Sequence, residues 1–164
     1  MTPPRELSPG LVVQHLPTAR KLTDYKLIAF DMDSTLINIE CVDEIADAAG
    51  RKAEVAAITE AAMQGVITDY KESLRQRVAL LKGVTVQHME QVFTERLRFN
   101  PGAKELITAA KAAGLTTLLV SGGFTFFADR VKAGLGIDFA RSNMLEVQDG
   151  QLTGRMVDQA WGDI

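Results

Sequence analysis

The 164-residue chain has a single cysteine and no excess of basic charge, and each shortage excludes a class of protein. Cys41 alone cannot form an internal disulfide, which argues against a secreted disulfide scaffold and agrees with a reducing compartment. With 18 basic against 21 acidic residues, the formal net charge is -3. Because nucleic acids and anionic membranes attract basic surfaces, neither is expected as a partner.

Long hydrophobic runs are also missing. No segment approaches the roughly 20 apolar residues that span a bilayer, and residues 1–10 lack the basic start and apolar stretch of a signal peptide. A cytoplasmic location is therefore expected. The chain is 46% hydrophobic, enough for a sizeable core, and its length fits one domain of about 150 residues with a small inserted subdomain.

Two short apolar runs, at residues 27–30 and 115–120, each stop abruptly at polar residues. Such runs are typical of buried parallel strands that deliver side chains to the carboxyl edge of a sheet. Helices are predicted at 101–113 and 124–135, and Asp149-Gly150 predicts a type I′ hairpin turn between 144–147 and 151–157. The fold class is therefore α/β with a Rossmann-like parallel sheet.

Residues 39–98 have a different pattern, in which apolar residues recur at three- and four-residue steps. The glycines at 50, 65 and 83 separate four such stretches, so four short helices are predicted. Prolines at 3, 4, 9 and 17 break up the first part of the chain. We therefore expect an irregular arm over 1–25, with one extended piece at 11–14, a partial α/β core over 26–38 and 99–164, and a helical subdomain over 39–98.

Two carboxylates, Asp31 and Asp33, follow the first predicted strand. Two residues apart at a turning strand end, both can reach one pocket, one as a nucleophile or metal ligand and the other as a proton donor. An isolated Asp-x-Asp also occurs in solvated turns. The preceding strand and the following Ser34-Thr35 favour the functional interpretation.

Ser121, Gly122 and Gly123 follow the second predicted strand and precede a helix. A hydroxyl and unhindered backbone N–H groups at a helix start can bind an anion. Glycine serving only a tight turn is the alternative interpretation. Because the carboxyl ends of parallel strands meet at one edge of a sheet, both motifs are expected to face one ligand, which indicates phosphoryl transfer.

Asp31-Met32-Asp33-Ser34-Thr35 and Ser121-Gly122-Gly123-Phe124 resemble the first two motifs of the haloacid-dehalogenase-like phosphatases. More narrowly, residues 31–49, 73–82 and 149–154 resemble the phosphoserine phosphatase family, and the four predicted helices resemble that family's cap. The resemblance covers about residues 26–154. It implies an enzyme that hydrolyses L-phosphoserine to serine and phosphate in L-serine biosynthesis.

The resemblance also implies roles for individual residues. Asp31 would attack phosphorus and form an aspartyl phosphate, while Asp33 would act as general acid and then general base. Asp31 and the backbone carbonyl of Asp33 would bind Mg²⁺, the implied cofactor, and Ser121, Gly122 and Gly123 would hold the phosphate oxygens.

In the cap, the resemblance assigns Glu40 to the substrate ammonium and Arg77 to its carboxylate, with Met63 and Gly65 near the substrate. Other interpretations come from the residues themselves. Arg77 shares a helical face with Leu74 and Val78, so it either reaches into a cleft or extends past the edge of the core. Glu40 alone resembles a solvated residue near a helix start, and Met63 alone resembles a core residue.

The chain also departs from the family's pattern. A lysine and a Gly-Asp-Gly-x-Asn-Asp strand end are expected after the phosphate motif. The only lysine there, Lys132, lies within the predicted helix, the strand end is not found, and Asp158 and Asp163 do not replace it. The chain thus resembles the N-terminal two thirds of the family, and either the strand at 27–30 is left with an edge that favours self-association or a segment of the intact protein has been lost. A catalytically impaired phosphoserine-binding or interaction module, and an enzyme for another small phosphomonoester, are the competing hypotheses.

Overall fold

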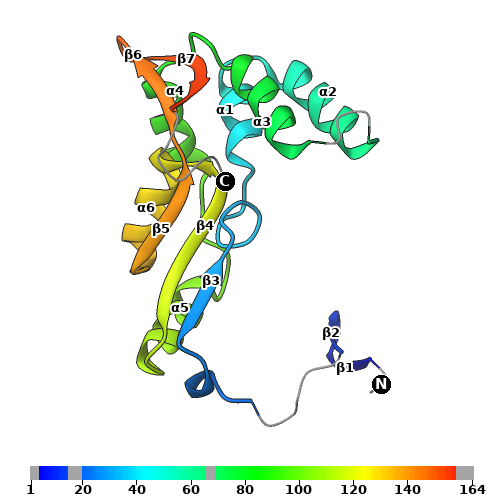
Figure 1. The fold of residues 1–164 in the computed structure, drawn as a ribbon, viewed down its shortest axis with the longest axis vertical. Helices are drawn as coiled ribbons and strands as arrows, with labels where there is room; N and C mark the ends of the chain where they lie inside the picture. Colours follow the sequence, from blue (N-terminus) through cyan, green and yellow to red (C-terminus); the bar gives the residue numbers. More distant parts are fainter. Residues whose placement is uncertain (1–3, 15–19, 66–68, 158–164) are drawn as a thin grey trace.

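The computed structural model describes residues 4–14, 20–65 and 69–157. Its central feature is a parallel sheet in the order β3-β4-β5, formed by Leu27–Phe30, Thr116–Phe124 and Phe139–Asn143 (Figure 1). The two predicted strands are confirmed as β3 and β4. The third strand, β5, was not predicted, because its sequence Phe-Ala-Arg-Ser-Asn lacks a continuous apolar run.

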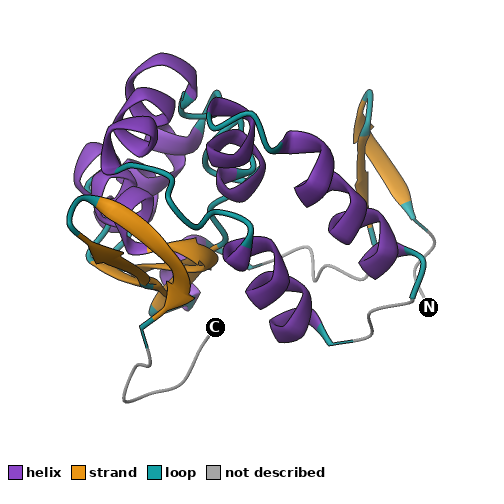
Figure 2. Cartoon of the chain, turned by 90° about the horizontal axis from the view of Figure 1, so that it is seen from above, coloured by secondary structure: helices purple, strands orange, loops and turns teal. Residues whose placement is uncertain are grey.

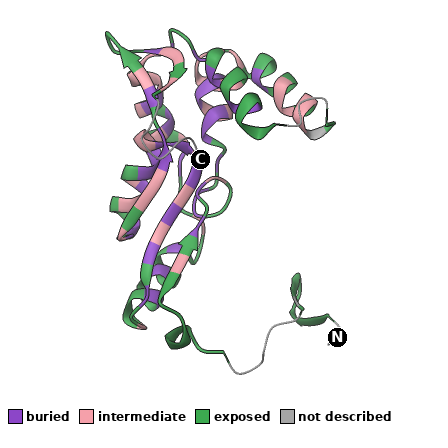
Figure 3. Cartoon of the chain, in the orientation of Figure 1, coloured by how far each residue is buried: buried purple, intermediate pink, exposed green. Residues whose placement is uncertain are grey.

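One face of this sheet is covered by helices α5 (Ala103–Ala112) and α6 (Thr125–Leu135), which both pack on β4 and contact each other. Strand β4 alternates accordingly: Thr117, Leu119 and Ser121 are buried, whereas Leu118 and Val120 are half-buried (Figure 3). This alternation follows from the two-residue side-chain period of a strand. One part of the core lies between β4 and these two helices, and the same cluster of buried residues continues into residues 39–97.

Between β3 and α5 the chain forms the predicted run of helices, which we call the helical segment. The fourth helix continues as a π-helix whose Arg96 bonds Glu44 at 2.7 Å and Asp47 at 2.5 Å on the first helix. No helix in the described ranges is long and apolar enough to cross a bilayer. The bounds are α1 Cys41–Ala48, α2 Lys52–Met63, α3 Tyr70–Ala79, α4 Val86–Gln91 and η2 Val92–Arg96.

The predicted hairpin is confirmed as β6 (Leu145–Gln148) and β7 (Gln151–Met156) (Figure 2). Asp149 and Gly150 have φ of 49° and 75°, the positive pair that a type I′ turn requires. Backbone bonds from Gly83 to Leu152 and from Leu152 to Val84, each 2.8 Å, attach the hairpin to the segment between α3 and α4.

The N-terminal arm differs from the irregular segment that we predicted. Arg5–Ser8 (β1) pairs with Leu11–Val13 (β2), and a short 3-10 helix η1 follows at Leu22–Asp24. Pro9 and Gly10 connect the two strands, and the φ of 82° at Gly10 suits the third position of a type II turn. The prolines therefore prevent a long helix but allow a short hairpin.

The two crossings between the sheet and the helical segment run side by side. Asn38 N–H donates to the Arg98 carbonyl at 3.0 Å, and Arg98 N–H donates to Asn38 Oδ1 at 2.6 Å. The Asn100 amide donates to the carbonyls of Thr35 at 2.9 Å and Ile37 at 3.0 Å. We call residues 36–38 and 98–100 the paired crossing.

At the other end of the sheet, Asp138 links β4 to the segment that enters β5. Its carboxylate accepts hydrogen bonds from Lys111 Nζ at 2.7 Å and from the N–H and hydroxyl of Thr117, each at 2.9 Å. These bonds, first of all that of Lys111, lower the pKa of Asp138 from 3.8 to about 2. The charged form is therefore favoured in the folded state.

We expect Asp138→Ala to lower the melting temperature at neutral pH, because three donors lose their acceptor. The folded-state pKa is depressed, so the contribution of Asp138 is complete above pH 3.8 and is lost as pH falls towards about 2. The melting temperatures of the wild type and Asp138→Ala should therefore converge as the pH falls towards about 2. Glu105→Ala, at an exposed acid on α5, is the control; an equal loss of stability at neutral pH and in acid would contradict the prediction.

Candidate active site

The first predicted motif forms the loop after β3. Asp31 is exposed, and its Oδ2 accepts a bond from the Thr35 hydroxyl at 3.2 Å, whereas Met32 is fully buried beneath the loop. Ser34 has a φ of 52°, a left-handed conformation that costs a residue with a side chain free energy. Asp31 is thus open to solvent, whereas Asp33 is half-buried.

Asp33 is held by the first residue of α1. The amide and thiol of Cys41 donate to the two oxygens of Asp33, at 3.3 Å and 3.1 Å. Burial raises the pKa of Asp33 from 3.8 to about 6; the Cys41 bonds lower it, and the charges of Glu40 and Asp31 raise it further. A carboxyl with this pKa can both donate and accept a proton near neutrality. In the sequence, Cys41 is the single thiol and part of an apolar helical stripe, and neither property predicts this contact.

Glu40, the residue before α1, lies beside the same loop. Its carboxylate is exposed, and its Oε1 accepts a hydrogen bond from the Ser34 hydroxyl at 2.6 Å. The left-handed turn at Ser34 therefore places Glu40 close to Asp33, whose pKa its charge raises. An exposed, oriented carboxylate can bind a cation such as an ammonium group.

The sequence suggested that Ser121, Gly122 and Gly123 follow β4. They instead lie within the strand, directly before its last residue, Phe124. Their pairing with β5 is irregular: Ser121 is opposite Ser142, whereas Phe124 is opposite the next residue, Asn143. The two glycines thus have no opposite residues in the register with β5, and the Gly122 carbonyl and the Gly123 N–H bond side chains instead, those of Asn143 and Ser121. Helix α6 begins immediately afterwards, at Thr125.

The structure brings the two motifs together. A Cβ atom added to Gly123 would lie 2.9 Å from Met32 Cε and 3.3 Å from Asp33 Oδ2. The backbone of Gly123 therefore passes directly against the Asp33 carboxyl, a close approach that glycine allows without displacing its neighbours. The Gly123 N–H donates to Ser121 Oγ at 2.9 Å, which leaves the hydroxyl hydrogen free to point elsewhere.

From the helical segment, α3 approaches this edge. The Tyr70 hydroxyl lies against Gly122, so closely that a Cβ at position 122 would overlap it. Arg77 is seven residues further along the same helix and hence on the same face. Its Nε is buried and has no hydrogen-bond partner among the described residues. A buried guanidinium nitrogen without a partner is costly and fits a residue that awaits an anion.

For two further predicted residues, Met63 and Gly65, the described residues provide no contact that tests their role. The side chain of Met63 lies outside the part that the structure describes, although the residue ends α2. Gly65 has a φ of 75° and follows that helix, with no atom within 4 Å of an added Cβ. Their assignment to substrate binding stays a prediction.

The donors at this edge suit a hard cation. Asp31 Oδ1 accepts no hydrogen bond from the described residues, and within the same ranges no three His, Cys, Asp or Glu side chains converge as a metal cluster. Mg²⁺ does not need such a cluster, because it keeps several waters and takes one or two carboxylates together with substrate phosphate. The exposed Asp31 carboxylate and the Asp33 carbonyl therefore fit Mg²⁺.

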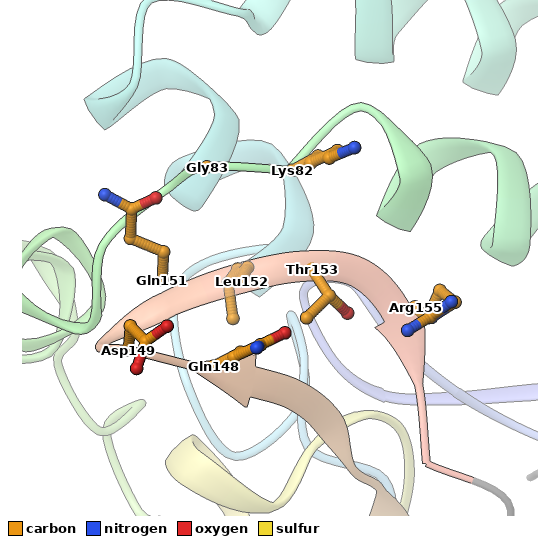
Figure 4. Close-up of a pocket in the computed structure, with 8 residues that line it drawn as sticks. All are labelled: Lys82, Gly83, Gln148, Asp149, Gln151, Leu152, Thr153 and Arg155. Carbon is orange, nitrogen blue, oxygen red and sulfur yellow. The ribbon is translucent and has the colours of Figure 1, made fainter.

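A separate open pocket of about 470 Å³ lies between the hairpin and the end of α3 (Figure 4). It contains none of the predicted site residues. Among the described residues that line it, no buried side-chain polar atom lacks a hydrogen-bond partner, and Arg155 bonds Glu146 at 2.9 Å. Its lining is Lys82, Gly83, Gln148, Asp149, Gln151, Leu152, Thr153 and Arg155.

Comparison with known proteins identifies the class of this site. Residues 28–161 match the family model of haloacid dehalogenase-like hydrolases. The chain is 73% identical to a phosphoserine phosphatase of a Polaromonas species and 70% identical to that of Albidiferax ferrireducens, in each case over 98% of this chain and 68% of the relative.

The fold matches as well. A solved structure described as a phospho-aspartyl intermediate analogue of phosphoserine phosphatase superposes with a TM-score of 0.73 and 44% identity. The match covers 80% of this chain and 62% of that one. The chain thus spans about two thirds of the length of the proteins it resembles.

Proposed function

Because the chain belongs to the haloacid dehalogenase-like hydrolases, we propose that it hydrolyses L-phosphoserine to serine and phosphate through an aspartyl phosphate on Asp31. The observation that carries this proposal is the approach of Asp33 to Gly123, 3.3 Å from an added Cβ. This approach places the Asp33 carboxyl, two residues after Asp31, beside the backbone that would bind phosphate. The relatives' shared name favours an enzyme over the alternative, a binding module without activity.

In the first step, a carboxylate oxygen of Asp31 forms a bond to phosphorus, and the bond from phosphorus to the serine oxygen breaks. Asp33, whose pKa is raised to about 6 by burial, donates its proton to the departing oxygen. Ser121 and the two glycines hold the phosphate oxygens. Mg²⁺ on Asp31 and the Asp33 carbonyl would offset the repulsion between the carboxylate and the phosphate.

In the second step, Asp33 is a carboxylate and removes a proton from a water molecule, which attacks phosphorus. The bond from phosphorus to Asp31 breaks, so phosphate leaves and both aspartates return to their starting states. Cys41 holds Asp33 through both of its oxygens in this cycle, and burial raises the pKa of the thiol, so it remains a donor.

Selection of the substrate is assigned to the helical segment. Glu40 would bind the serine ammonium and Arg77 its carboxylate, a pairing of opposite signs that fits a zwitterion. Met63 and Gly65 would complete the substrate site. In this proposal residues 39–98 are a cap on a core of 26–38 and 99–164, and the enzyme supplies serine in the cytoplasm.

Phosphate release from L-phosphoserine, measured with and without Mg²⁺, tests the proposal. Turnover that depends on Mg²⁺ is the expected result. No turnover together with a melting temperature raised by L-phosphoserine would instead support the binding module. Faster release from other phosphomonoesters would mean that the enzyme is correctly assigned but its substrate is not.

The edge of β3 supports a second proposal, that two copies of the 164-residue chain associate there. Among the described strands, β3 pairs with β4 alone, and Leu27 is 52% exposed. An apolar strand with unpaired backbone groups is a template for another strand. Light scattering should detect a dimer that Ala29→Lys converts to monomer, because a charged residue at an edge opposes pairing; a wild-type chain that stays monomeric at all concentrations would contradict it.

A further inference from the structure

The two glycines of the phosphate motif create a problem that the proposed function leaves open. A Cβ atom at Gly122 would overlap the Tyr70 hydroxyl, and one at Gly123 would crowd Met32 and Asp33, so a side chain at either position would require its neighbours to move. Two consecutive glycines are the most flexible backbone that a chain can have. The strand register does not restrain them either, because β5 has no residues opposite them. Some other group must therefore hold the peptide between them.

Asn143 supplies that restraint. It is 1% exposed at the end of β5, and its Nδ2 donates to the Gly122 carbonyl at 2.9 Å. The Gly122 carbonyl and the Gly123 N–H belong to one planar peptide group, in which they point in opposite directions. The N–H donates to Ser121 Oγ at 2.9 Å. Both ends of this peptide are thus held, one by Asn143 and the other by Ser121.

The orientation of this peptide decides whether an N–H or a carbonyl oxygen lies beside the Ser121 hydroxyl, which the proposed function assigns to the substrate phosphate. If the peptide turned over, the Gly122 carbonyl oxygen would point to the side where the N–H now lies. A carbonyl oxygen repels phosphate, whereas an N–H attracts it. We propose that Asn143 is a positioning residue that prevents this flip and so keeps the Ser121–Gly123 backbone competent to bind the substrate phosphate.

This inference rests on the proposed function, and the experiment separates the two. Asn143→Ala removes the donor, and Asn143→Asp replaces it with an isosteric acceptor. Asp138→Ala is the matched control, because it deletes a side-chain link at the opposite end of the same two strands. Binding of inorganic phosphate and of L-phosphoserine is measured by calorimetry, and the amide signals of Gly122 and Gly123 are followed by nitrogen-proton NMR.

Both Asn143 variants are expected to raise the Kd for phosphate and for L-phosphoserine about tenfold and to shift the two glycine amide signals. Asp138→Ala should lower the melting temperature and leave both Kd values unchanged. Unchanged Kd values in the Asn143 variants would overturn the inference alone, because they would make Asn143 a purely structural residue. A wild-type chain that binds neither ligand would overturn the proposed function and the inference with it.

Discussion

Replacing Asp31 by asparagine is expected to lower phosphate release from L-phosphoserine by about 10⁴-fold or more, the scale seen when a covalent nucleophile is removed. An amide oxygen is a far weaker nucleophile than a carboxylate, and it cannot neutralise a cation. The fold should be unaffected, because Asp31 is exposed and only the Thr35 hydroxyl contacts its carboxylate among the described residues.

Three measurements make this prediction specific. Steady-state release gives the loss of rate, and trapping of phosphorylated protein from radiolabelled phosphoserine should succeed with the wild type and fail with Asp31→Asn. Asp129→Asn, at an exposed acid on α6, should leave both unchanged. A labelled Asp31→Asn protein, or one that keeps a tenth of the wild-type rate, would place the nucleophile elsewhere.

Replacing Arg77 by alanine is expected to raise KM for L-phosphoserine by about 100-fold, the cost of losing a charge-assisted, two-pronged bond to a carboxylate. The kcat value should change little, because Arg77 would bind the carboxylate far from the phosphorus. Phosphoethanolamine has no carboxylate, so it should be hydrolysed more weakly than L-phosphoserine. Its rate of hydrolysis should be the same for the wild type and Arg77→Ala. Equal loss with both substrates would mean that Arg77 does not read the carboxylate.

Stability provides a second readout for Arg77. Its buried Nε lacks a partner among the described residues, so Arg77→Ala removes an uncompensated polar group and should not lower the melting temperature. Lys71→Ala, at an exposed position on the same helix, is the control for effects on α3 itself. A clear loss of stability in Arg77→Ala would instead indicate an arginine that supports the core.

The sequence was informative where one residue type dominates a short stretch. The apolar runs at β3 and β4 predicted buried strands, and Asp149-Gly150 predicted a hairpin turn. These features could be predicted because they depend on local sequence preferences. Strand β5 could not be predicted, because it is set by pairing with β4 rather than by its own residues. For the same reason the extension of β4 through the phosphate motif was missed.

The candidate site divides in the same way. The approach of Asp33 to Gly123 could be predicted, since Asp33 follows β3 and Gly123 lies near the carboxyl end of the neighbouring parallel strand β4. Cys41 and Asn143 could not be, because each acts on a residue that no spacing rule connects to it. A buried asparagine at a strand end carries no sequence signal that separates it from a turn residue.

The paired crossing also bears on how such an enzyme could change its specificity. Because residues 36–38 and 98–100 lie side by side, the chain leaves the α/β layer and re-enters it at nearly one point. The entropy of closing a loop grows only slowly with its length, so a module of another size could be grafted there without distorting the sheet. Such a graft would keep Asp31 and Ser121 but lose Cys41, so a new module would have to bring its own donor for Asp33.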